Sequence, residues 1–267
     1  MLSVAIGGMG AIGLRLAKEL DRGIEGLSLA AVAARDAEKV KAAVAGFRKP
    51  PAVTDLAGLA ASADVVVEAA PAAVFEAIVA PAVEAGKIVV ISSVGALLPR
   101  MHLVERAKET GARIIVPTGA LLGLDAVRAA AEGNVESVTL VTRKPPRGLA
   151  GAPYLEQHGI DVTTITTPTK IFDGSAREGA KGFPANVNVA AALALAGIGP
   201  DRTRLEIWAD PTVVRNTHTV KVEADTVRLT MTIENVPSEE NPRTGKITPL
   251  SLLACLRGLT ATLKVGS

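Results

Sequence analysis

The stretch Gly8-Met9-Gly10-Ala11-Ile12-Gly13 follows the apolar run Leu2–Ile6 and opens a helical segment. It matches the pattern G-x-G-x-x-G in the strand-to-helix context that this pattern requires, although glycines at such spacing also occur in ordinary turns. Gly8 allows a tight turn, Gly10 lets the backbone approach a pyrophosphate, and Gly13 permits close packing of helix on strand. The start of the helix would then offer free N–H groups to phosphate. The stretch therefore predicts a dinucleotide-binding fold.

Short β-branched runs and helical stretches alternate through the first half of the chain. This alternation predicts a parallel sheet with helices on both faces, which is a doubly wound Rossmann fold. Uninterrupted apolar strands such as Val65–Glu68 agree with a sheet that is covered on both sides. The expected strands are Leu2–Ile6, Leu27–Ala34, Val65–Glu68, Ile88–Ile91 and Arg113–Val116, and the expected helices are Ile12–Asp21, Glu38–Ala45, Val74–Glu84 and Met101–Thr110.

The pattern changes after Pro117, where strands follow one another with fewer helices between them. This predicts a second α+β domain, residues 118–244, with a mixed or antiparallel sheet. The final segment, Pro249–Thr262, has the pattern of an amphipathic helix, and we expect residues 245–267 to complete the first domain, residues 1–117. The expected strands of the second domain are Ser137–Thr142, Asp161–Ile165, Arg204–Ile207, Thr219–Val222 and Val227–Ile233.

The composition indicates a small-molecule partner. Hydrophobic residues make up 48% of the chain and aromatic residues only 2%, so the core must be filled by Ala, Val, Leu and Ile. With 29 basic and 27 acidic residues the net charge is +2, which is too small to indicate binding to nucleic acid or to an anionic membrane. The apolar stretch Val187–Pro200 is shorter than the roughly 20 residues of a membrane-spanning helix.

The cysteine and histidine content indicates neither a disulfide nor a metal site. The single cysteine, Cys255, lies in an apolar run, so we expect a buried structural thiol and a reducing, cytoplasmic compartment. The cysteine and the three histidines of the sequence form no cluster with the spacing of metal ligands. We expect His102 on a surface helix and His158 at a helix end, where a cation complements the helix dipole.

The end of the second strand, Ala33-Ala34-Arg35-Asp36, bears on the choice of cofactor. If Ala34 takes the position where NAD enzymes carry an acidic residue, Arg35 could face a 2′-phosphate, which favours NADP. If the register is shifted, Asp36 serves the ribose and NAD is preferred. Arg35 and Asp36 can equally be a solvated loop pair, so the sequence leaves NAD or NADP open.

Two further loops lie beyond the carboxyl ends of strands, where a doubly wound sheet binds its ligand. One is Ala69-Ala70-Pro71 and the other is Ser92-Ser93-Val94-Gly95-Ala96. Small residues and hydroxyls in the second loop could border a nicotinamide, and we take Ala70 and Ser93 as candidate contacts. An ordinary strand-to-helix turn explains the second loop equally well.

The second half of the chain carries a family resemblance. Its stretches are Pro117–Asp125, Phe183–Ala191 with Ala209–Pro211 and Asn216–His218, and Asn241–Gly245 with Leu250–Leu253. With the glycine turn and Thr142–Pro146, these motifs resemble the L-aspartate dehydrogenase family over nearly the whole chain.

The resemblance implies NAD(P)-linked, reversible oxidation of L-aspartate to iminoaspartate. It also implies a homodimer and, in many organisms, a supply route to the pyridine ring of NAD. By position, His218 matches the active-site histidine of the family, and Ala120 and Asn188 match contacts on the nicotinamide side. The complete set of expected cofactor contacts is Gly8, Gly10, Ala11, Ile12, Gly13, Arg35, Ala70, Ser93, Ala120 and Asn188.

The expected chemistry can also be stated from the residues. Removal of hydride from C2 of an amino acid requires an unprotonated amine, and His218 is the best-placed group that titrates near neutrality. Asn186 or Asn188 could instead cap the helix that follows them. The two carboxylates of the substrate need donors, for which the candidates are Lys144, Asn186, Arg215 and Thr217, although exposed Lys and Arg are more often simply solvated.

Two other functions remain open from the sequence. The first is a homoserine-dehydrogenase-like or imine-reducing oxidoreductase on the same architecture. The second is a non-catalytic NAD(P)-binding sensor, against which the presence of Asn188 and His218 argues. A panel of amino-acid substrates with both cofactors separates these functions.

Overall fold

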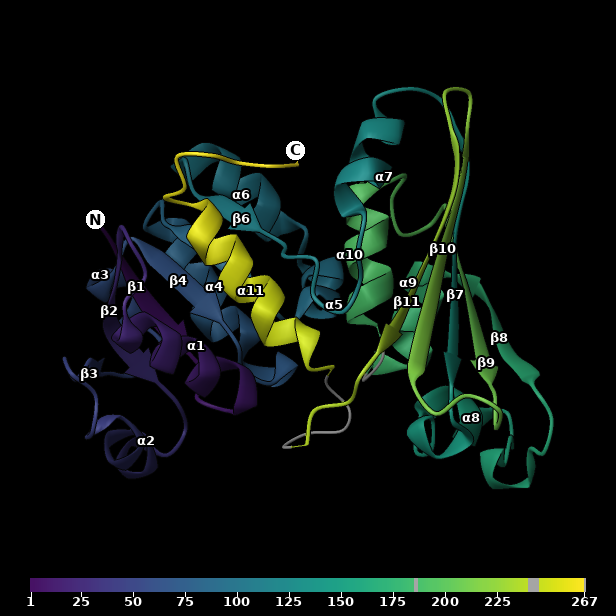
Figure 1. Ribbon diagram of the computed structural model, residues 1–267, viewed down its shortest axis with the longest axis horizontal. Helices are drawn as coiled ribbons and strands as arrows, with labels where there is room; N and C mark the ends of the chain where they lie inside the picture. The colour runs from purple at the N-terminus through teal and green to yellow at the C-terminus, as the bar shows by residue number, and fades with distance from the viewer. Residues whose placement is uncertain (185–186, 240–244, 267) are drawn as a thin grey trace. The chain divides into compact units, whose positions relative to one another are not determined.

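The computed structural model describes residues 1–184, 187–239 and 245–266, and the chain divides into two compact units. The first unit combines Met1–Pro117 with Thr248–Lys264, and the second spans Thr118–Ile247 with Val265–Ser267. The chain therefore leaves the first unit after Pro117 and returns to it with its last helix, drawn in yellow in Figure 1.

The first unit is built on a parallel sheet with the strand order β3-β2-β1-β4-β5-β6. The order reverses between β1 and β4, as in a doubly wound fold. The prediction of a Rossmann sheet is therefore confirmed. Its strands are β1 (Leu2–Gly7), β2 (Leu27–Ala33), β3 (Ala52–Val53), β4 (Val65–Glu68), β5 (Ile88–Ile91) and β6 (Arg113–Ile115).

The helices of the first unit begin and end where the sequence provides local signals. Asp36 caps the start of α2 by accepting a hydrogen bond from the backbone N–H of Lys39. Gly111, with φ +76, ends α6 in the left-handed region. These helices are α1 (Ala11–Arg22), α2 (Ala37–Val44), α3 (Leu59–Ser62), α4 (Phe75–Glu84), α5 (Val94–Leu97), α6 (His102–Thr110) and α11 (Ile247–Gly258), with 3-10 turns η1 (Ala72–Val74) and η2 (Leu98–Arg100).

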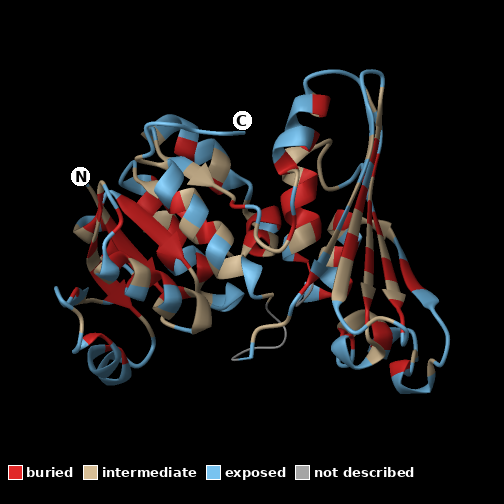
Figure 2. Ribbon diagram, in the orientation of Figure 1, coloured by how far each residue is buried: buried red, intermediate tan, exposed pale blue. Residues whose placement is uncertain are grey.

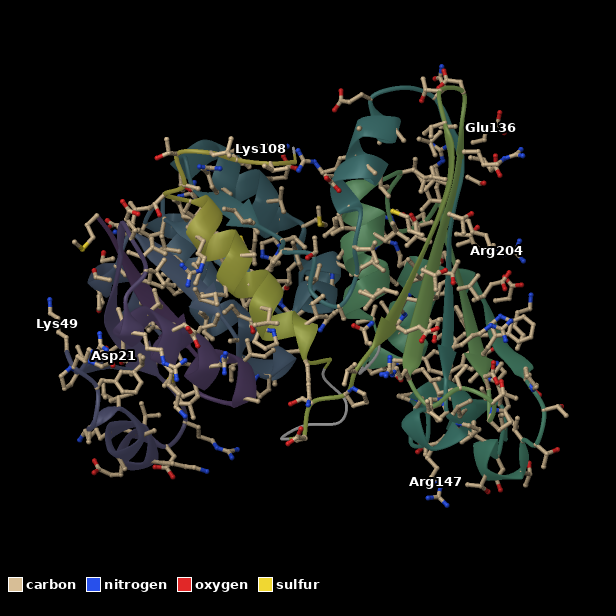
Figure 3. All side chains as sticks on the ribbon, viewed as in Figure 1. Asp21, Lys49, Lys108, Glu136, Arg147 and Arg204 are labelled. Atoms are coloured by element: carbon tan, nitrogen blue, oxygen red, sulfur yellow. The ribbon has the colours of Figure 1, made fainter. Side chains whose placement is uncertain are left out.

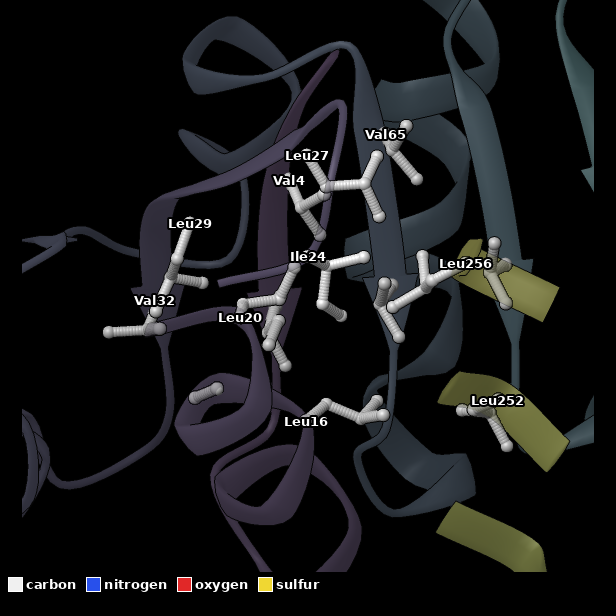
Figure 4. Packing of buried hydrophobic residues seen from close by; sticks show 14 of the residues in the cluster. Val4, Leu16, Leu20, Ile24, Leu27, Leu29, Val32, Val65, Leu252 and Leu256 are labelled. Atoms are coloured by element: carbon white, nitrogen blue, oxygen red, sulfur yellow. The ribbon is translucent and has the colours of Figure 1, made fainter. Parts of the chain in front are cut away.

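The C-terminal helix α11 is part of the hydrophobic core of the first unit. Leu252 and Leu256 are fully buried in the same cluster as Val4 of β1, Leu16 of α1 and Val65 of β4 (Figure 4). Burial of each leucine side chain stabilises the fold by roughly 1.5–3 kcal/mol. The last helix thus stabilises a domain whose other elements all precede residue 118.

The second unit contains a mixed five-stranded sheet with the order β11-β10-β7-β9-β8. β7 and β9 run parallel, and the other neighbouring pairs are antiparallel. The prediction of a second α+β domain is confirmed. Its strands are β7 (Val135–Lys144), β8 (Thr169–Ser175), β9 (Thr203–Ala209), β10 (Asn216–Ala224) and β11 (Arg228–Asn235).

Helices α7, α9 and α10 lie along one face of this sheet (Figure 1), which we call the inner face. A Cβ at Gly197, which follows α10, would lie 3.2 Å from Val127 of α7 and 3.5 Å from Val138 of β7. Small residues thus bring these elements close together. The helices are α7 (Leu124–Ala131), α8 (Pro153–Gln157), α9 (Ala176–Gly182) and α10 (Asn188–Ala196), with 3-10 turns η3 (Pro146–Gly148) and η4 (Val162–Thr164).

One predicted strand of the second unit is wrong. The segment Asp161–Ile165 contains the 3-10 turn η4, whose start is capped by the carboxylate of Asp161. A local hydrogen bond from a side chain competes here with strand pairing, in spite of the β-branched residues. The pairing strand is β8, which follows a few residues later.

Buried residues run along the strands of both sheets, whereas charged side chains extend from the surface (Figures 2 and 3). Examples are Lys108 on α6 and Arg204 on β9. No helix of the described residues is long and apolar enough to cross a membrane.

Candidate active site

Two glycines of the turn between β1 and α1 are required by the packing of the protein itself. Gly8 has φ +99, and a Cβ there would lie 2.4 Å from the carbonyl oxygen of Ala69. A Cβ at Gly13 would lie 1.8 Å from the carbonyl oxygen of Gly8. A side chain at either position would collide with backbone atoms, so these glycines hold the turn against the ends of the strands.

Gly10 has a different environment. Its φ of −76° is open to any residue, and a Cβ there would meet no described atom within 4 Å. Gly10 is the N-cap residue of α1 and has no side chain that could cap the N–H groups of the first turn, where Ala11 and Ile12 lie. The start of this helix therefore offers uncapped donors beside open space, which suits an anionic group.

At the end of β2, Asp36 and Arg35 differ in what they bind. The Asp36 carboxylate accepts the N–H of Lys39 at 3.0 Å and is used to cap α2. Arg35 is exposed, directly after the half-buried Ala34. Of the alternatives left open by the sequence, a cation next to a small residue at the strand end is the one that the geometry favours.

The loops that follow β4 and β5 are joined by Glu68, a residue that the sequence analysis did not single out. Glu68 is fully buried. Its carboxylate accepts hydrogen bonds from the backbone N–H groups of Ala70, Ser92 and Ser93 at 2.8–3.1 Å. The hydroxyl of Ser93 lies 3.0 Å from both Glu68 Oε1 and the carbonyl oxygen of Ala70. Burial raises the pKa of Glu68, and these hydrogen bonds oppose the rise.

In the second unit, His218 lies at the polar end of an otherwise apolar sheet face. Alternate residues of β7 are buried, and along the strand they change from Val138 and Leu140 to Thr142 and Lys144. His218 of β10 pairs with Thr142, so both side chains share the inner face. The distance between Thr142 Oγ1 and His218 Nδ1 is 3.0 Å. His218 is 4% exposed and Lys144 is 6% exposed.

Burial and mutual repulsion shift the titration of this pair. Burial lowers the pKa of His218 to about 3, and the nearby Lys144 ammonium contributes to the shift. Burial also lowers the pKa of Lys144 to about 8. Strongly shifted titratable groups that lie together are typical of functional sites. The imidazole is neutral at pH 7, and the lysine is mostly charged.

Asp210 fixes the end of β7 next to this pair. Its backbone N–H donates to the carbonyl oxygen of Lys144 at 2.8 Å. Its buried carboxylate accepts hydrogen bonds from Arg143 and from the backbone N–H and hydroxyl of Thr212. Because both neighbours of the strand end are bonded to Asp210, the position of Lys144 is well determined.

The remaining candidates of the second unit are placed differently. Thr217 is adjacent to His218 in a regular strand, so its side chain lies on the opposite face of the sheet. Asn188 is the first residue of α10, whose N-cap is Val187, so the expected capping by Asn188 is wrong. Asn186 lies outside the described residues. The carbonyl oxygen of Ala120 accepts a hydrogen bond from Asn235 Nδ2 at 3.0 Å.

The other histidines and the cysteine lie where the sequence indicated. His102 is exposed at the start of α6, and His158 follows α8, where its Nδ1 lies 2.8 Å from the carbonyl oxygen of Tyr154. Burial raises the pKa of Cys255 to about 11, so its thiol is protonated at neutral pH. The described part of the chain contains no cluster of His, Cys, Asp and Glu that could hold a metal ion.

Comparison with known proteins places these units in families. Residues 125–259 match the model described as aspartate dehydrogenase, C-terminal, and residues 8–117 match that of the NAD binding domain of homoserine dehydrogenase. An L-aspartate dehydrogenase from Bradyrhizobium diazoefficiens is 57% identical over 266 residues, which cover 100% of this chain and 94% of the relative. The chain belongs to the L-aspartate dehydrogenase family.

Members of the L-aspartate dehydrogenase family from distant organisms resemble this chain over its full length. One from Methanosarcina barkeri is 38% identical over 271 residues and is matched over 100% of both chains. The crystal structure of aspartate dehydrogenase from Thermotoga maritima superimposes with a TM-score of 0.74 at 26% identity, again with 100% of both chains covered. A dehydrogenase from the same organism, with a TM-score of 0.53 and 16% identity, shows the fold alone.

Proposed function

We propose that this protein is an NAD(P)-dependent L-aspartate dehydrogenase that converts L-aspartate to iminoaspartate, which water hydrolyses to oxaloacetate and ammonia. The observation that carries the proposal is the buried imidazole of His218, bonded to Thr142 and next to Lys144, in a chain 57% identical to an L-aspartate dehydrogenase. A neutral imidazole and a buried cation are the groups that a deprotonating site for a dicarboxylate needs.

The glycine turn of the first unit is the proposed site for the cofactor pyrophosphate. Gly10 leaves open space in front of uncapped N–H groups of α1, where phosphate is favoured by the helix dipole. When bound, NAD(P) accepts the hydride from C2 of the substrate. Ala70 and Ser93 belong to the loops at the same edge of the sheet, and Ala120 and Asn188 are the proposed contacts from the second unit.

His218 is the proposed catalytic base. If Nδ1 carries the proton and donates it to Thr142 Oγ1, the lone pair of Nε2 is free to accept a proton from the substrate amine or from the water that attacks the iminium. The same hydrogen bond is retained when the ring becomes an imidazolium. A bound dicarboxylate would raise the pKa of His218 from its low value, because negative charge favours the protonated ring.

Lys144 is the proposed partner of one substrate carboxylate. Its ammonium is buried next to the imidazole, so a carboxylate bound there would compensate a charge that burial penalises. Thr217 is not included in this site because it lies on the other face of the sheet. Asn186 remains a proposed contact that the described residues do not test.

For the cofactor, we propose that both NAD and NADP are used, with Arg35 facing the 2′-phosphate of NADP. The support is that Arg35 is exposed after Ala34, whereas Asp36 caps α2. From the family resemblance we further propose a homodimer in the cytoplasm and a role in NAD biosynthesis. Light scattering of the purified protein measures the oligomeric state.

The test of the function is a substrate panel. Purified protein is supplied with L-aspartate, D-aspartate, L-homoserine or L-glutamate, each with NAD and with NADP, and reduced cofactor is followed by its absorbance. We expect turnover with L-aspartate and little with the others. A preference for L-homoserine would assign a different substrate, and cofactor binding without turnover of any amino acid would indicate a sensor.

A further inference from the structure

Glu68 occupies the point where the strand order of the first sheet reverses. It is the last residue of β4 and pairs with Gly7 of β1 on one side and with Ile91 of β5 on the other. Ligands of doubly wound sheets bind beyond the carboxyl ends of the strands at this point. Glu68 therefore lies directly beneath the edge at which we place the dinucleotide.

The carboxylate of Glu68 determines the conformation of both neighbouring loops. Oε1 accepts the N–H of Ala70 in the loop after β4, and Oε2 accepts the N–H groups of Ser92 and Ser93 after β5. The hydroxyl of Ser93 lies within 3.0 Å of Oε1 and of the carbonyl oxygen of Ala70, which closes the link between the loops.

The link extends to the glycine turn. The N–H of Ala69 donates to the carbonyl oxygen of Gly7 at 2.8 Å. The peptide between Ala69 and Ala70 also lies so close to Gly8 that a Cβ there would come within 2.4–2.7 Å of three of its atoms. Glu68 thus fixes the peptide that supports the turn, in addition to the two loops.

A carboxylate is an expensive way to join two loops. All of the groups that donate to Glu68 in these bonds are neutral, and the residue is fully buried, so its charge is stabilised by hydrogen bonds alone. An apolar side chain would fill the same volume without the desolvation penalty, but it would accept no hydrogen bond. The use of a carboxylate indicates that the exact position of these loops matters to function.

We propose that Glu68 is a positioning residue for the dinucleotide, which holds the loops after β4 and β5 and the glycine turn in the geometry that receives the cofactor. This inference rests on the proposed function. It concerns the cofactor and not the reacting atoms, because Glu68 acts through Ala70, Ser93 and Gly8.

The test is the substitution Glu68→Gln, which keeps the shape of the side chain. Whichever way the amide is oriented, its NH2 group faces at least one backbone N–H that now lacks an acceptor, so one of the two loops is released. We expect the dissociation constant of NADH, measured by its fluorescence, to rise about tenfold. At saturating cofactor, the KM for L-aspartate and kcat should stay within about threefold of the parent values, because cofactor binding restores the loops.

Two further variants make the outcome decisive. Glu84→Gln removes an exposed carboxylate of the same unit, paired with Arg106, and should bind NADH as the parent does. Ser93→Ala keeps the backbone donors and removes only the hydroxyl, so it should weaken NADH binding about threefold even if Glu68→Gln fails to fold. Parent-like affinity in Ser93→Ala and in folded Glu68→Gln overturns the proposal, as does a loss confined to kcat. If the unsubstituted protein binds neither NADH nor NADPH, the proposed function itself fails.

Discussion

Thr142 and His218 face each other across the paired strands β7 and β10, with 3.0 Å between Thr142 Oγ1 and His218 Nδ1. A threonine hydroxyl can both donate and accept a hydrogen bond, so this contact is compatible with either tautomer of the ring and with the imidazolium. Thr142 can therefore hold His218 in place while the ring gains and loses a proton.

Replacement of Thr142 tests this role. Thr142→Val keeps the volume and leaves Nδ1 of a buried ring without its partner, so we expect kcat to fall about tenfold. Thr142→Ser should retain most of the activity. Thr219→Val on β10 is the matched control, because Thr219 bonds to Thr232 on the exposed face. Equal kcat in Thr142→Val and Thr219→Val would show that the hydroxyl does not assist the ring.

Replacement of His218 tests the proposed base. His218→Ala should lower turnover about 100-fold or more, because the only proposed proton acceptor is lost. NADH binding should survive, because His218 and the glycine turn belong to different units. His102→Ala, at an exposed position of α6, is the control and should be fully active. Turnover of His218→Ala at the parent rate would remove His218 from the mechanism.

The lowered pKa of Lys144 predicts a pH dependence of carboxylate binding. Succinate has two carboxylates and no amine, so its inhibition constant reports the charge of the site without the titration of a substrate amine. The lysine is charged below its pKa of about 8 and neutral above it, so succinate affinity should fall as pH rises from 7 to 10.

Lys144→Arg provides the comparison for this prediction. Arginine stays charged throughout that range, so in a variant that still binds succinate the affinity should become nearly independent of pH. The inhibition constants are obtained from initial rates in the reductive direction. A fall of equal size in both proteins would place the titrating group elsewhere.

Two glycines of one turn should fail in different ways. Gly8→Ala places a Cβ 2.4 Å from the carbonyl oxygen of Ala69 at a positive φ, so the first unit should be destabilised by a few kcal/mol, on the order of 1–3. Gly10→Ala has room within the protein, so its melting temperature should stay close to that of the parent.

The distinction between the two glycines lies in the cofactor. If pyrophosphate occupies the space in front of Gly10, Gly10→Ala should weaken NADH binding at least about tenfold while the fold is retained. Thermal unfolding and NADH titration of the same preparations give both quantities. Unchanged NADH affinity in Gly10→Ala would contradict a pyrophosphate at this turn.

The sequence by itself determined the class of both units and the position of the glycine turn. These features depend on short-range signals, namely the spacing of glycines, runs of β-branched residues and the alternation of strand and helix. The same local reasoning was wrong for Asp161–Ile165, where a side-chain cap replaces strand pairing, and for Asn188, which begins α10 without capping it.

Only the tertiary structure decided which polar side chains act together. Thr142 and His218 are 76 residues apart, and their contact exists because the register of β7 and β10 places them opposite each other on the buried face. The same register directs Thr217 to the other face, since neighbouring residues of a strand point in opposite directions. Glu68 reads in sequence as the end of an apolar strand, and its role follows from hydrogen bonds to a loop 24 and 25 residues away. Strand pairing brings such groups together through contacts that no local pattern encodes.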